Sequence, residues 1–256
     1  MFYPKQVPYL LNKAFQKNVD YQEQEIEELK DYVMCFWSMQ SKRICSNEIA
    51  VSILPDACID IVIDFTNEII CFAGFSKETM VLELKQKIDI LGVRLKPSSF
   101  FLLFHIEASK VMDHPILFEE IDDRVSLKTI FMIKEDFNRK RLLKDYLLSK
   151  VTPIEDKRML LWVDRLYKEP REQRVYEMAK TFGYHSRHLN RIFKKYYGVS
   201  PKVLLNILRL HLCLTLLLEQ KNLMEIISLC GFYDQSHFIK EIKRYTGFSP
   251  LELIQN

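Results

Sequence analysis

The chain has 256 residues, of which 48% are hydrophobic and 28% are charged, and it contains only 6 glycines. These proportions exclude a disordered chain or a low-complexity repeat array, and the length is enough for two domains of about 100 to 150 residues each. The net charge of +3 hides an asymmetry: residues 153–256 hold 17 basic and 11 acidic side chains, whereas residues 1–152 hold 20 and 23. This split predicts that the C-terminal part binds a polyanion.

Targeting signals and metal motifs are missing from the sequence itself. The start has no apolar run of signal-peptide length, and no window is expected to approach the ~18 apolar residues of a spanning helix, which predicts a cytoplasmic protein without membrane association. Six cysteines lie far apart with no Cys-x-x-Cys pair, so we expect reduced and mostly buried thiols. His105 and His114 are nine residues apart and are expected to be structural, so we predict neither a metal site nor a cofactor.

Strand signals dominate the first 95 residues after a polar, acid-rich lead over residues 1–30, which we expect to be solvated surface and to which we assign no fold. Short turns between the strands favour antiparallel pairing in a small sheet or barrel over β-α-β crossovers. The expected strands cover Tyr32 to Ser38, Ile49 to Leu54, Ile59 to Phe65, Glu68 to Phe75, Thr79 to Leu84 and Ile88 to Leu95.

The third of these strands alternates most regularly, with isoleucines on one face and Asp60 and Asp64 on the other. The two carboxylates could bind a cationic or sugar ligand, but solvated strand carboxylates are more common. Arg94, on the last strand, is expected to be an ion-pair partner inside the domain rather than a ligand clamp.

Helical patterns follow the strands. Pro97 is suited to the first turn of an apolar helix that packs on the sheet, and the segment from Ser126 to Lys150 has apolar residues, Phe137 among them, near helical spacing. A further helix over Ile154 to Tyr167 either completes the N-terminal domain or forms a dimer face. Lys168-Glu-Pro170 then ends this region as a linker.

The most informative stretch is Ser186 to Gly198. Its apolar residues Leu189, Ile192, Phe193 and Tyr196 recur at i, i+3, i+4 and i+7, which predicts a short helix with one buried face and a basic opposite face. A preceding apolar stripe (Val175, Met178, Ala179, Phe182) and the turn at Gly183 give helix-turn-helix geometry, with Ser186 expected to cap the second helix and Ala179 at the crossing of the two helices.

The same small unit occurs again near the C-terminus, where Gly231, His237 and Gly247-Phe-Ser-Pro250 repeat the earlier Gly183, His188 and Gly198-Val-Ser-Pro201. Asp234 is expected to cap its second helix, and Asn222-x-x-Glu225 reads as a capping box for its first. A leucine-rich helix from Pro201 to Glu219, with Ser200 as cap and Gly198 as the preceding helix stop, joins the two units. Its length of roughly 28 Å is of the order of the ~34 Å that separates successive major grooves.

These motifs, taken together, resemble the DNA-binding domain of AraC/XylS-type transcription regulators over about the last 85 residues. The stretches Leu54-Pro-Asp-Ala-Cys-Ile-Asp-Ile and Leu91-Gly-Val-Arg-Leu-Lys-Pro97 more weakly resemble small β-rich, cupin-related sensor domains. The resemblance implies an α+β chain: an N-terminal antiparallel β-rich, barrel-like domain with packed helices, then an all-α domain of two helix-turn-helix units on a linker helix. The expected divisions are a sensor domain over 1–150, a helix and linker over 151–170, and the DNA-binding domain over 171–256.

The resemblance also implies which side chains meet DNA. Base contacts fall on Arg187 and Arg191 in the first unit and on Ser236, His237 and Lys240 in the second, while Lys194 and Lys195 are expected on phosphates. For His188 and His237 a purely packing or capping role stays open. The full expected contact set is Arg187, His188, Asn190, Arg191, Lys194, Lys195, Gln235, Ser236, His237, Lys240, Lys243 and Arg244.

Two departures from the family pattern concern the second unit. Ile227 stands where the family usually has alanine, and Leu251-Glu252-Leu253 replaces the usual Tyr-Arg. Residues 171–201 carry 7 basic and 2 acidic side chains, whereas residues 223–250 carry 3 of each, so we expect the first unit to dominate affinity and the second to adjust specificity.

The sequence therefore predicts a transcription regulator and not an enzyme. Its partner is double-stranded DNA, with recognition helices near 186–197 and 235–246, and the N-terminal domain senses a small-molecule effector or forms a homodimer; RNA polymerase is a further candidate partner. The alternatives are a cupin-type enzyme, or a protein-interaction domain, fused to a DNA-tethering module.

Overall fold

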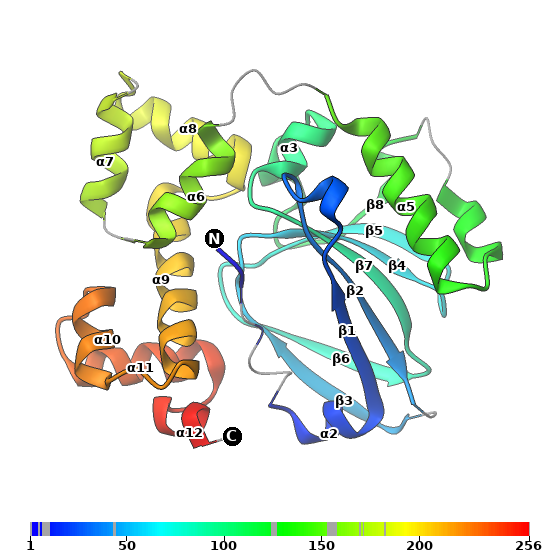
Figure 1. Cartoon of the computed structure of the whole chain (residues 1–256), viewed down its shortest axis with the longest axis horizontal. Helices are drawn as coiled ribbons and strands as arrows, with labels where there is room; N and C mark the ends of the chain where they lie inside the picture. Colours follow the sequence, from blue (N-terminus) through cyan, green and yellow to red (C-terminus); the bar gives the residue numbers. More distant parts are fainter. Residues whose placement is uncertain are drawn as a thin grey trace.

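A β-rich N-terminal domain and a helical C-terminal domain lie side by side in the computed structural model (Figure 1). The structure describes residues 2–4, 6, 11–42, 45–123, 127–152, 158–168, 170, 172–181 and 183–255. The chain begins between the two domains and ends beside the last helices of the second (Figure 1). The predicted fold class is confirmed.

All six predicted strands are present, and every pairing among the described strands is antiparallel. The order in the large sheet is β1-β2-β7-β4-β5-β8, and β3 pairs with β6 in a second, two-stranded sheet. The bounds are β1 Val19–Gln24, β2 Val33–Ser41, β3 Cys45–Ile53, β4 Ile59–Asp64, β5 Ile69–Gly74, β6 Met80–Gln86, β7 Asp89–Leu95 and β8 Ile116–Leu117.

The large sheet has two different faces because side chains alternate along each strand. On β4, Ile59, Ile61 and Ile63 are buried under the helices of the N-terminal domain. The intervening residue Val62 packs on a second apolar cluster that includes Trp37 and lies between the sheets, so this face lines the barrel-like interior. Asp60 shares this face, and its expected solvation is wrong: its side chain is only 16% exposed.

The lead over residues 1–30 contains regular structure that the sequence did not reveal. After α2 (Lys13–Asn18), capped by the Asn12 side chain, β1 pairs with β2 along its whole length from Val19↔Ser41 to Gln24↔Phe36. The segment to which we assign no fold is therefore a strand, and four of its six residues are exposed, in agreement with the expected solvated surface. Its polar composition concealed a pattern that only the partner strand completes.

Short helices cover the large sheet, and two of them differ from expectation. The apolar helix α3 (Ser99–Phe104) begins two residues after Pro97, and its N-cap Ser98 has a left-handed φ of 77°. The expected long helix is interrupted, with a 3-10 turn η3 (Leu127–Met132) before α5 (Asp136–Lys150), and Phe137 is 74% exposed rather than in the core. The remaining short elements are η1 Glu27–Leu29, η2 Ala108–Val111 and α4 Phe118–Ile121.

The C-terminal helices pack around one central helix, α9, which contacts α6, α7, α8, α10 and α12. The helix α6 supplies Trp162 and Leu166 to the core formed by α7, α8 and α9, so a division at residue 171 separates helices that share a core. Residues 153–157, Phe182 and the side chain of Met178 lie outside the described residues. The bounds are α6 Arg158–Lys168, α7 Glu172–Thr181, α8 Ser186–Tyr197, α9 Pro201–Leu218, α10 Leu223–Cys230, α11 Gln235–Thr246 and α12 Pro250–Gln255.

Helix α9 corrects the expectation that no segment approaches a spanning helix. By length and composition alone it is long and apolar enough to cross a membrane, and half of it is buried inside the structure. Its neighbours on several sides explain the apolar sequence, because a helix that is hydrophobic around most of its circumference is typical of a core position.

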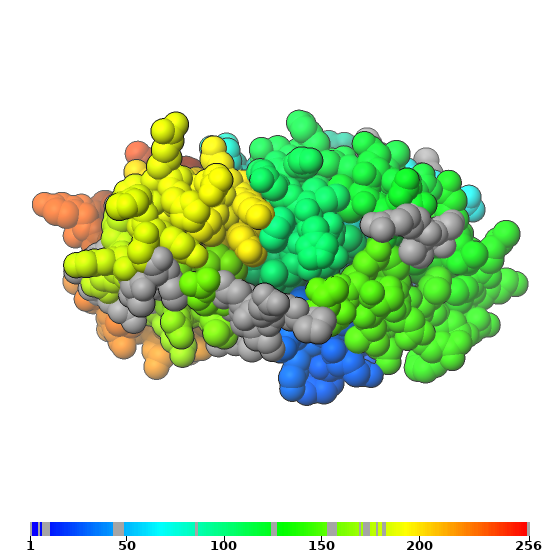
Figure 2. Space-filling view, turned by 90° about the horizontal axis from the view of Figure 1, so that it is seen from above, coloured from blue at the N-terminus to red at the C-terminus, as the bar shows by residue number. Residues whose placement is uncertain are grey.

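The two domains share continuous apolar packing. Met34, Cys58 and Phe75 of the N-terminal domain belong to the core of the first helical unit, and Leu54 belongs to the core of the second. Seen from above, the α8 region (yellow) lies directly against the α3 region (green-teal) (Figure 2). The interface is therefore part of the hydrophobic core rather than a loose surface contact.

Candidate nucleic-acid interface

The first helix-turn-helix unit consists of α7 and α8 joined by a turn at Gly183, where φ is +66°. Glycine adopts this left-handed conformation without steric cost. Ser186 is the first residue of α8 and His185 occupies the N-cap position, so the expected Ser186 cap is wrong. The Ser186 carbonyl instead accepts a hydrogen bond from the Asn190 side chain at 3.0 Å.

The predicted two faces of α8 are confirmed. Leu189 and Phe193 are buried, and Phe193 packs on Trp162 of α6 with ring centroids 5.6 Å apart. The sequence missed Tyr197, which is fully buried and donates a hydrogen bond to the Met159 carbonyl at 2.5 Å. Burial raises the pKa of the Tyr197 hydroxyl well above its usual range, so it remains a donor.

The exposed face of α8 carries a histidine–arginine pair. Nη2 of Arg191 lies 3.1 Å from Nδ1 of His188, and the His188 ring meets the Tyr184 ring edge-on at 4.9 Å. Because a guanidinium only donates, His188 Nδ1 must accept in this pair. His188 thereby supports one of the expected base-reading arginines.

The C-terminal end of α8 faces the N-terminal domain. Lys195 Nζ lies 4.5 Å from the centre of the Phe101 ring on α3, and the Tyr196 ring meets Phe101 at 4.7 Å. Gly198 ends the helix at φ +76°, as predicted, beside Met112. Lys195 is thus directed differently from Lys194, its exposed neighbour.

The second unit consists of α10 and α11. Asn222 caps α10 through Met224 N at 2.9 Å, and Asp234 caps α11 through His237 N at 2.7 Å. Phe238 and Ile242 are fully buried beneath α11. Ile227, in place of the family's usual alanine, is buried within the same core. The predicted contacts on α11 are exposed, namely Gln235, Ser236, His237, Lys240, Lys243 and Arg244.

One α11 side chain has a carboxylate neighbour. His237 Nε2 lies 3.3 Å from Glu241 Oε2, and Glu241 Oε1 lies 3.6 Å from Nη2 of Arg209 on α9. The Arg209 guanidinium also lies 4.9 Å from the centre of the Phe232 ring. Sequence patterns could not find this contact because Arg209 is about 30 residues away from its partner along the chain.

The connector α9 is held at its start and middle. Ser200 caps it through Val203 N at 3.4 Å with Pro201 at the first turn, as predicted. Its His211 is fully buried, and Nε2 lies 2.8 Å from the carbonyl oxygen of Pro55 in the N-terminal domain. The helix that carries both units is therefore hydrogen-bonded directly to the other domain.

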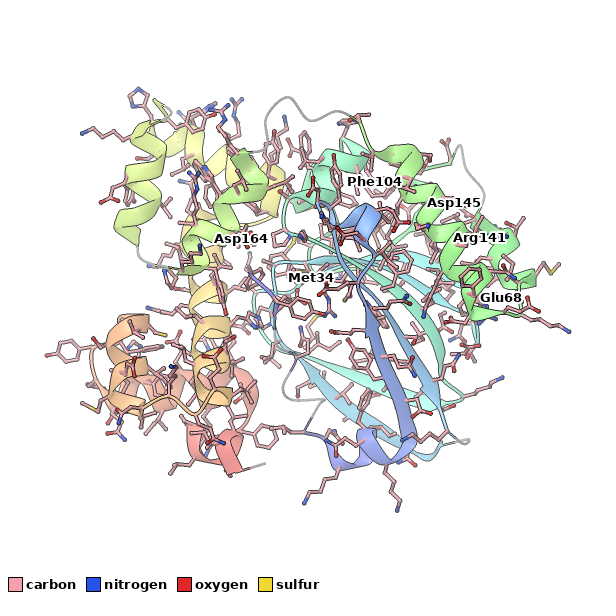
Figure 3. The ribbon with its side chains drawn as sticks, viewed as in Figure 1. Met34, Glu68, Phe104, Arg141, Asp145 and Asp164 are labelled. Atoms are coloured by element: carbon pink, nitrogen blue, oxygen red, sulfur yellow. The ribbon has the colours of Figure 1, made fainter. Side chains whose placement is uncertain are left out.

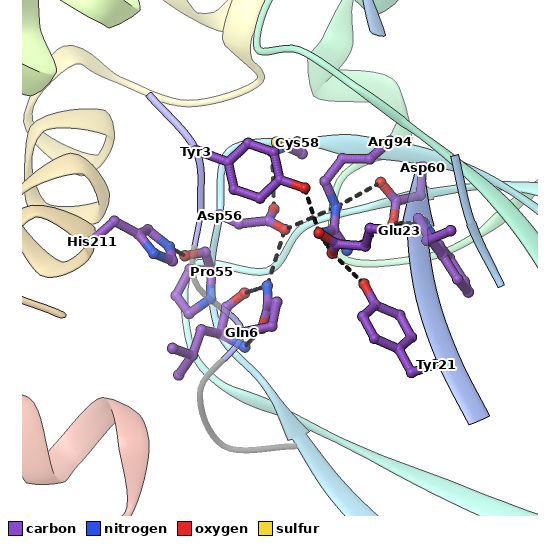
Figure 4. A network of polar contacts seen from close by, with 12 residues as sticks. Tyr3, Gln6, Tyr21, Glu23, Pro55, Asp56, Cys58, Asp60, Arg94 and His211 are labelled. Carbon is purple, nitrogen blue, oxygen red and sulfur yellow. Dashed lines mark hydrogen bonds and ion pairs between the residues drawn. The ribbon is translucent and has the colours of Figure 1, made fainter. Parts of the chain in front are cut away.

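A buried polar cluster lies beside Pro55, in the barrel-like interior of the N-terminal domain (Figure 4). Arg94, only 5% exposed, forms ion pairs with Asp56 (3.8 Å), Asp60 (3.4 Å) and Glu23 (3.6 Å), which confirms its predicted role. Burial raises the pKa of Asp60 to about 6, although Arg94 opposes the shift. Asp64 instead caps its turn by accepting from Thr66 N at 2.8 Å.

The N-terminal segment joins this cluster to the helical domain. The Tyr3 hydroxyl donates to Glu23, and the Gln6 side chain bonds to Asp56 and to both backbone groups of Leu54. Phe2 N donates to Asp164 on α6 at 2.6 Å, and Figure 3 shows Asp164 directed toward this segment. No local sequence pattern predicts these contacts, because each pairs residues about 20 to 160 positions apart.

The described cysteines Cys35, Cys58, Cys71, Cys213 and Cys230 are free thiols, and all but Cys71 are buried, in agreement with expectation. Burial raises the pKa of Cys35 to about 12, so this thiol stays protonated. Within the part of the chain that the structure describes, no three His, Cys, Asp or Glu side chains are grouped as metal ligands.

Comparison with known proteins agrees with this geometry. Residues 178–256 match a helix-turn-helix domain family. The chain is also 35% identical over 83 residues to an uncharacterized HTH-type transcriptional regulator, YidL of Escherichia coli (strain K12); this match covers 32% of the chain and 28% of YidL. The C-terminal domain is an AraC-type helix-turn-helix domain.

The region preceding the AraC-type domain matches a domain of unknown function (DUF6597) over residues 26–116. The expected likeness to cupin-related sensors stays a prediction. Among solved structures, ToxT from Vibrio cholerae aligns at 13% identity and a TM-score of 0.42, covering 93% of this chain and 98% of ToxT. A structure of unsaturated fatty acid bound ToxT aligns at 13% identity and 0.40, covering 93% of each chain.

Proposed function

We propose that the chain is a sequence-specific DNA-binding transcription regulator that acts in the cytoplasm. The observation that carries this proposal is the pair of exposed, polar helix faces on α8 and α11, presented by an AraC-type domain on one buried connector helix. Recognition helices of this class place their N-terminal residues against base edges in the major groove. The family assignment supports a regulator rather than an enzyme.

In this proposal Arg187 and Arg191 read bases from α8, and Lys194 neutralises phosphate. Bidentate arginine–guanine pairing is the commonest specific contact in the major groove. On α11, Ser236, His237 and Lys240 are the proposed base contacts, with Lys243 and Arg244 toward the backbone. The higher positive charge around the first unit makes it the larger contributor to affinity.

The N-terminal domain is proposed to sense a signal and pass it to the connector. Its support is the set of links that reach the helical domain: Phe101 on Tyr196, Pro55 on His211, and Thr79, whose hydroxyl donates to the Tyr245 carbonyl at 2.6 Å. These contacts touch both helix-turn-helix units and the helix between them. A movement of the N-terminal domain would therefore change the positions of the two helix-turn-helix units relative to each other.

The test is selection of duplexes from a randomised pool by the full-length protein, followed by titration of the selected sequence over a salt series. We expect selective binding, and we expect Arg191→Ala to lower selectivity by about 5- to 150-fold, equivalent to ~1–3 kcal/mol. Arg141→Ala is the matched control, since Arg141 is an exposed arginine on α5 of the other domain (Figure 3). Recovery of no preferred sequence, or equal effects of both substitutions, would contradict the proposal.

A further inference from the structure

The second unit contains a closed ring of four side chains around His237. His237 contacts Glu241 through Nε2 (3.3 Å), Glu241 faces Arg209 (3.6 Å), Arg209 lies over Phe232 (4.9 Å), and the Phe232 ring meets the His237 ring at 5.4 Å. These residues come from α9, the turn before α11, and α11 itself. Only His237 is substantially exposed, at 49% of its side chain, against 18% for Glu241 and 22% for Arg209.

Each member limits the movement of the next. Glu241 lies one turn after His237 on the same helix, where side chains four residues apart are neighbours. Arg209 is held in turn by Phe232 and by the Asn206 side chain, whose Oδ1 lies 3.4 Å from Nη2. Arg209 therefore holds the Glu241 carboxylate close to the connector helix.

The ring also decides which imidazole nitrogen carries hydrogen. An ionised carboxylate only accepts hydrogen, so the carboxylate 3.3 Å from Nε2 favours the tautomer with hydrogen on Nε2. Arg209 supplies the counter-charge for Glu241, 3.6 Å away. A neutral imidazole carries one hydrogen, and Glu241 is the acceptor beside Nε2. Nδ1 is then a bare acceptor, near the start of a recognition helix where base contacts are made.

The first unit, built on the same pattern, uses its histidine in the opposite way. The position matching Glu241 is Ile192, at the same offset of 49 that relates His237 to His188. Without a carboxylate there, Nδ1 of His188 lies against Nη2 of Arg191. The aromatic residue beside the histidine is retained, as Tyr184 in one unit and Phe232 in the other. His188 therefore positions Arg191, whereas His237 is itself positioned by Glu241.

We propose that His237 reads DNA as a hydrogen-bond acceptor through Nδ1, and that Glu241 and Arg209 are positioning residues that fix this state without touching DNA. The bases that match a neutral acceptor in the major groove are those that present an exocyclic amino group, adenine through N6 or cytosine through N4. This inference rests on the proposed function and deepens it for the second unit.

The experiment uses the full-length protein and its selected duplex. Loss of base preference in His237→Ala identifies the base pair that His237 reads. At that pair, a base analogue lacking only the exocyclic amino group is expected to weaken wild-type binding by on the order of ten-fold. In Glu241→Ile, which copies the first unit, the same analogue should have little effect, because the acceptor is no longer fixed.

Two further measurements separate positioning from folding. Glu241→Gln keeps the size of the side chain and should also reduce the analogue effect, and the ¹⁵N shifts of the imidazole should show hydrogen on Nε2 in the wild type but a mixed state in both Glu241 variants. Glu225→Gln is the matched control, because Glu225 is an exposed glutamate on α10, and it should leave both readouts unchanged. Folded Glu241 variants with wild-type tautomer and wild-type response to the analogue would overturn the inference.

The outcomes also separate this inference from the proposed function. Failure of the wild type to select any sequence overturns the regulator assignment itself. Two outcomes leave the regulator assignment in place and overturn only the inference. In the first, selective binding is lost in Arg191→Ala but unchanged in His237→Ala. In the second, His237→Ala changes the base preference but the Glu241 variants do not.

Discussion

The two helix-turn-helix units share a scaffold and differ in the chemistry that they expose. Each recognition helix ends at a left-handed glycine, Gly198 with φ +76° and Gly247 with φ +78°, and each packs a fully buried phenylalanine beneath it. The outer surfaces diverge: the first is basic and packs on α3, whereas the second has equal numbers of basic and acidic side chains and contains a carboxylate–histidine pair. The two units therefore share the residues that stabilise the fold and differ in the side chains that they expose to solvent.

The shared scaffold predicts equal and large losses of stability from matched core truncations. Phe193→Ala and Phe238→Ala should each lower the free energy of unfolding by about 3–5 kcal/mol, because both side chains are fully buried. Urea titration followed by circular dichroism measures the change. A small effect in one unit alone would show that the two cores are not equivalent.

A smaller difference should separate the exposed faces. Arg191→Ala should weaken binding to the selected duplex by about 1–3 kcal/mol, and Lys240→Ala by less, about 1 kcal/mol, because a lysine offers no bidentate pairing. Fluorescence anisotropy at a fixed salt concentration compares the two variants. A larger loss from Lys240→Ala would reverse the proposed ranking of the units.

The glycines that end the two recognition helices should differ in the cost of replacement by alanine. Gly247→Ala should cost about 1 kcal/mol from its left-handed backbone alone, since among the described residues a Cβ there meets nothing within 4 Å. Gly198→Ala should cost more, because its Cβ would lie 2.6 Å from the Met112 sulfur across the domain interface. Thermal unfolding of both variants checks this order. Equal losses would mean that Met112 moves aside freely.

The smallest effect concerns two neighbouring lysines. Lys194→Ala should reduce the slope of log affinity against log salt by about 1, as expected for one lost phosphate contact. Lys195→Ala should reduce it less, because its ammonium group lies over the Phe101 ring of the other domain. Equal slopes for the two variants would indicate that Lys195 leaves that ring on binding DNA.

Local patterns predicted the parts of the fold that depend on local physics. The alternation on β4, the Ser200–Pro201 start of α9 and the Asp234 cap follow from neighbouring residues alone. Features that were missed depend on distant partners. β1 pairs along its whole length with β2, and the buried Asp60 has Arg94 and the Trp37 indole as its partners. The wrong Ser186 cap is a displacement of one residue, the usual uncertainty of a helix end.

The same limit applies to the candidate site. Periodicity and motif order predicted which face of each recognition helix is exposed, since burial of Phe193 or Phe238 fixes the opposite side. They could not predict that Lys195 turns toward Phe101, or that Arg209 orients Glu241. Those contacts depend on how α9 places the units in space, which no single helix encodes.

The hydrogen bond from buried His211 to the Pro55 carbonyl bears on how freely the two domains could be exchanged between regulators. His211 is fully enclosed, so transplanting residues 158–255 onto a foreign sensor would expose or orphan a polar ring within an apolar helix. The loop from Leu54 to Cys58 would have to travel with the helices, or His211 be replaced by leucine. The central helix α9 thus requires the N-terminal domain of this chain, because that domain supplies the Pro55 carbonyl to His211.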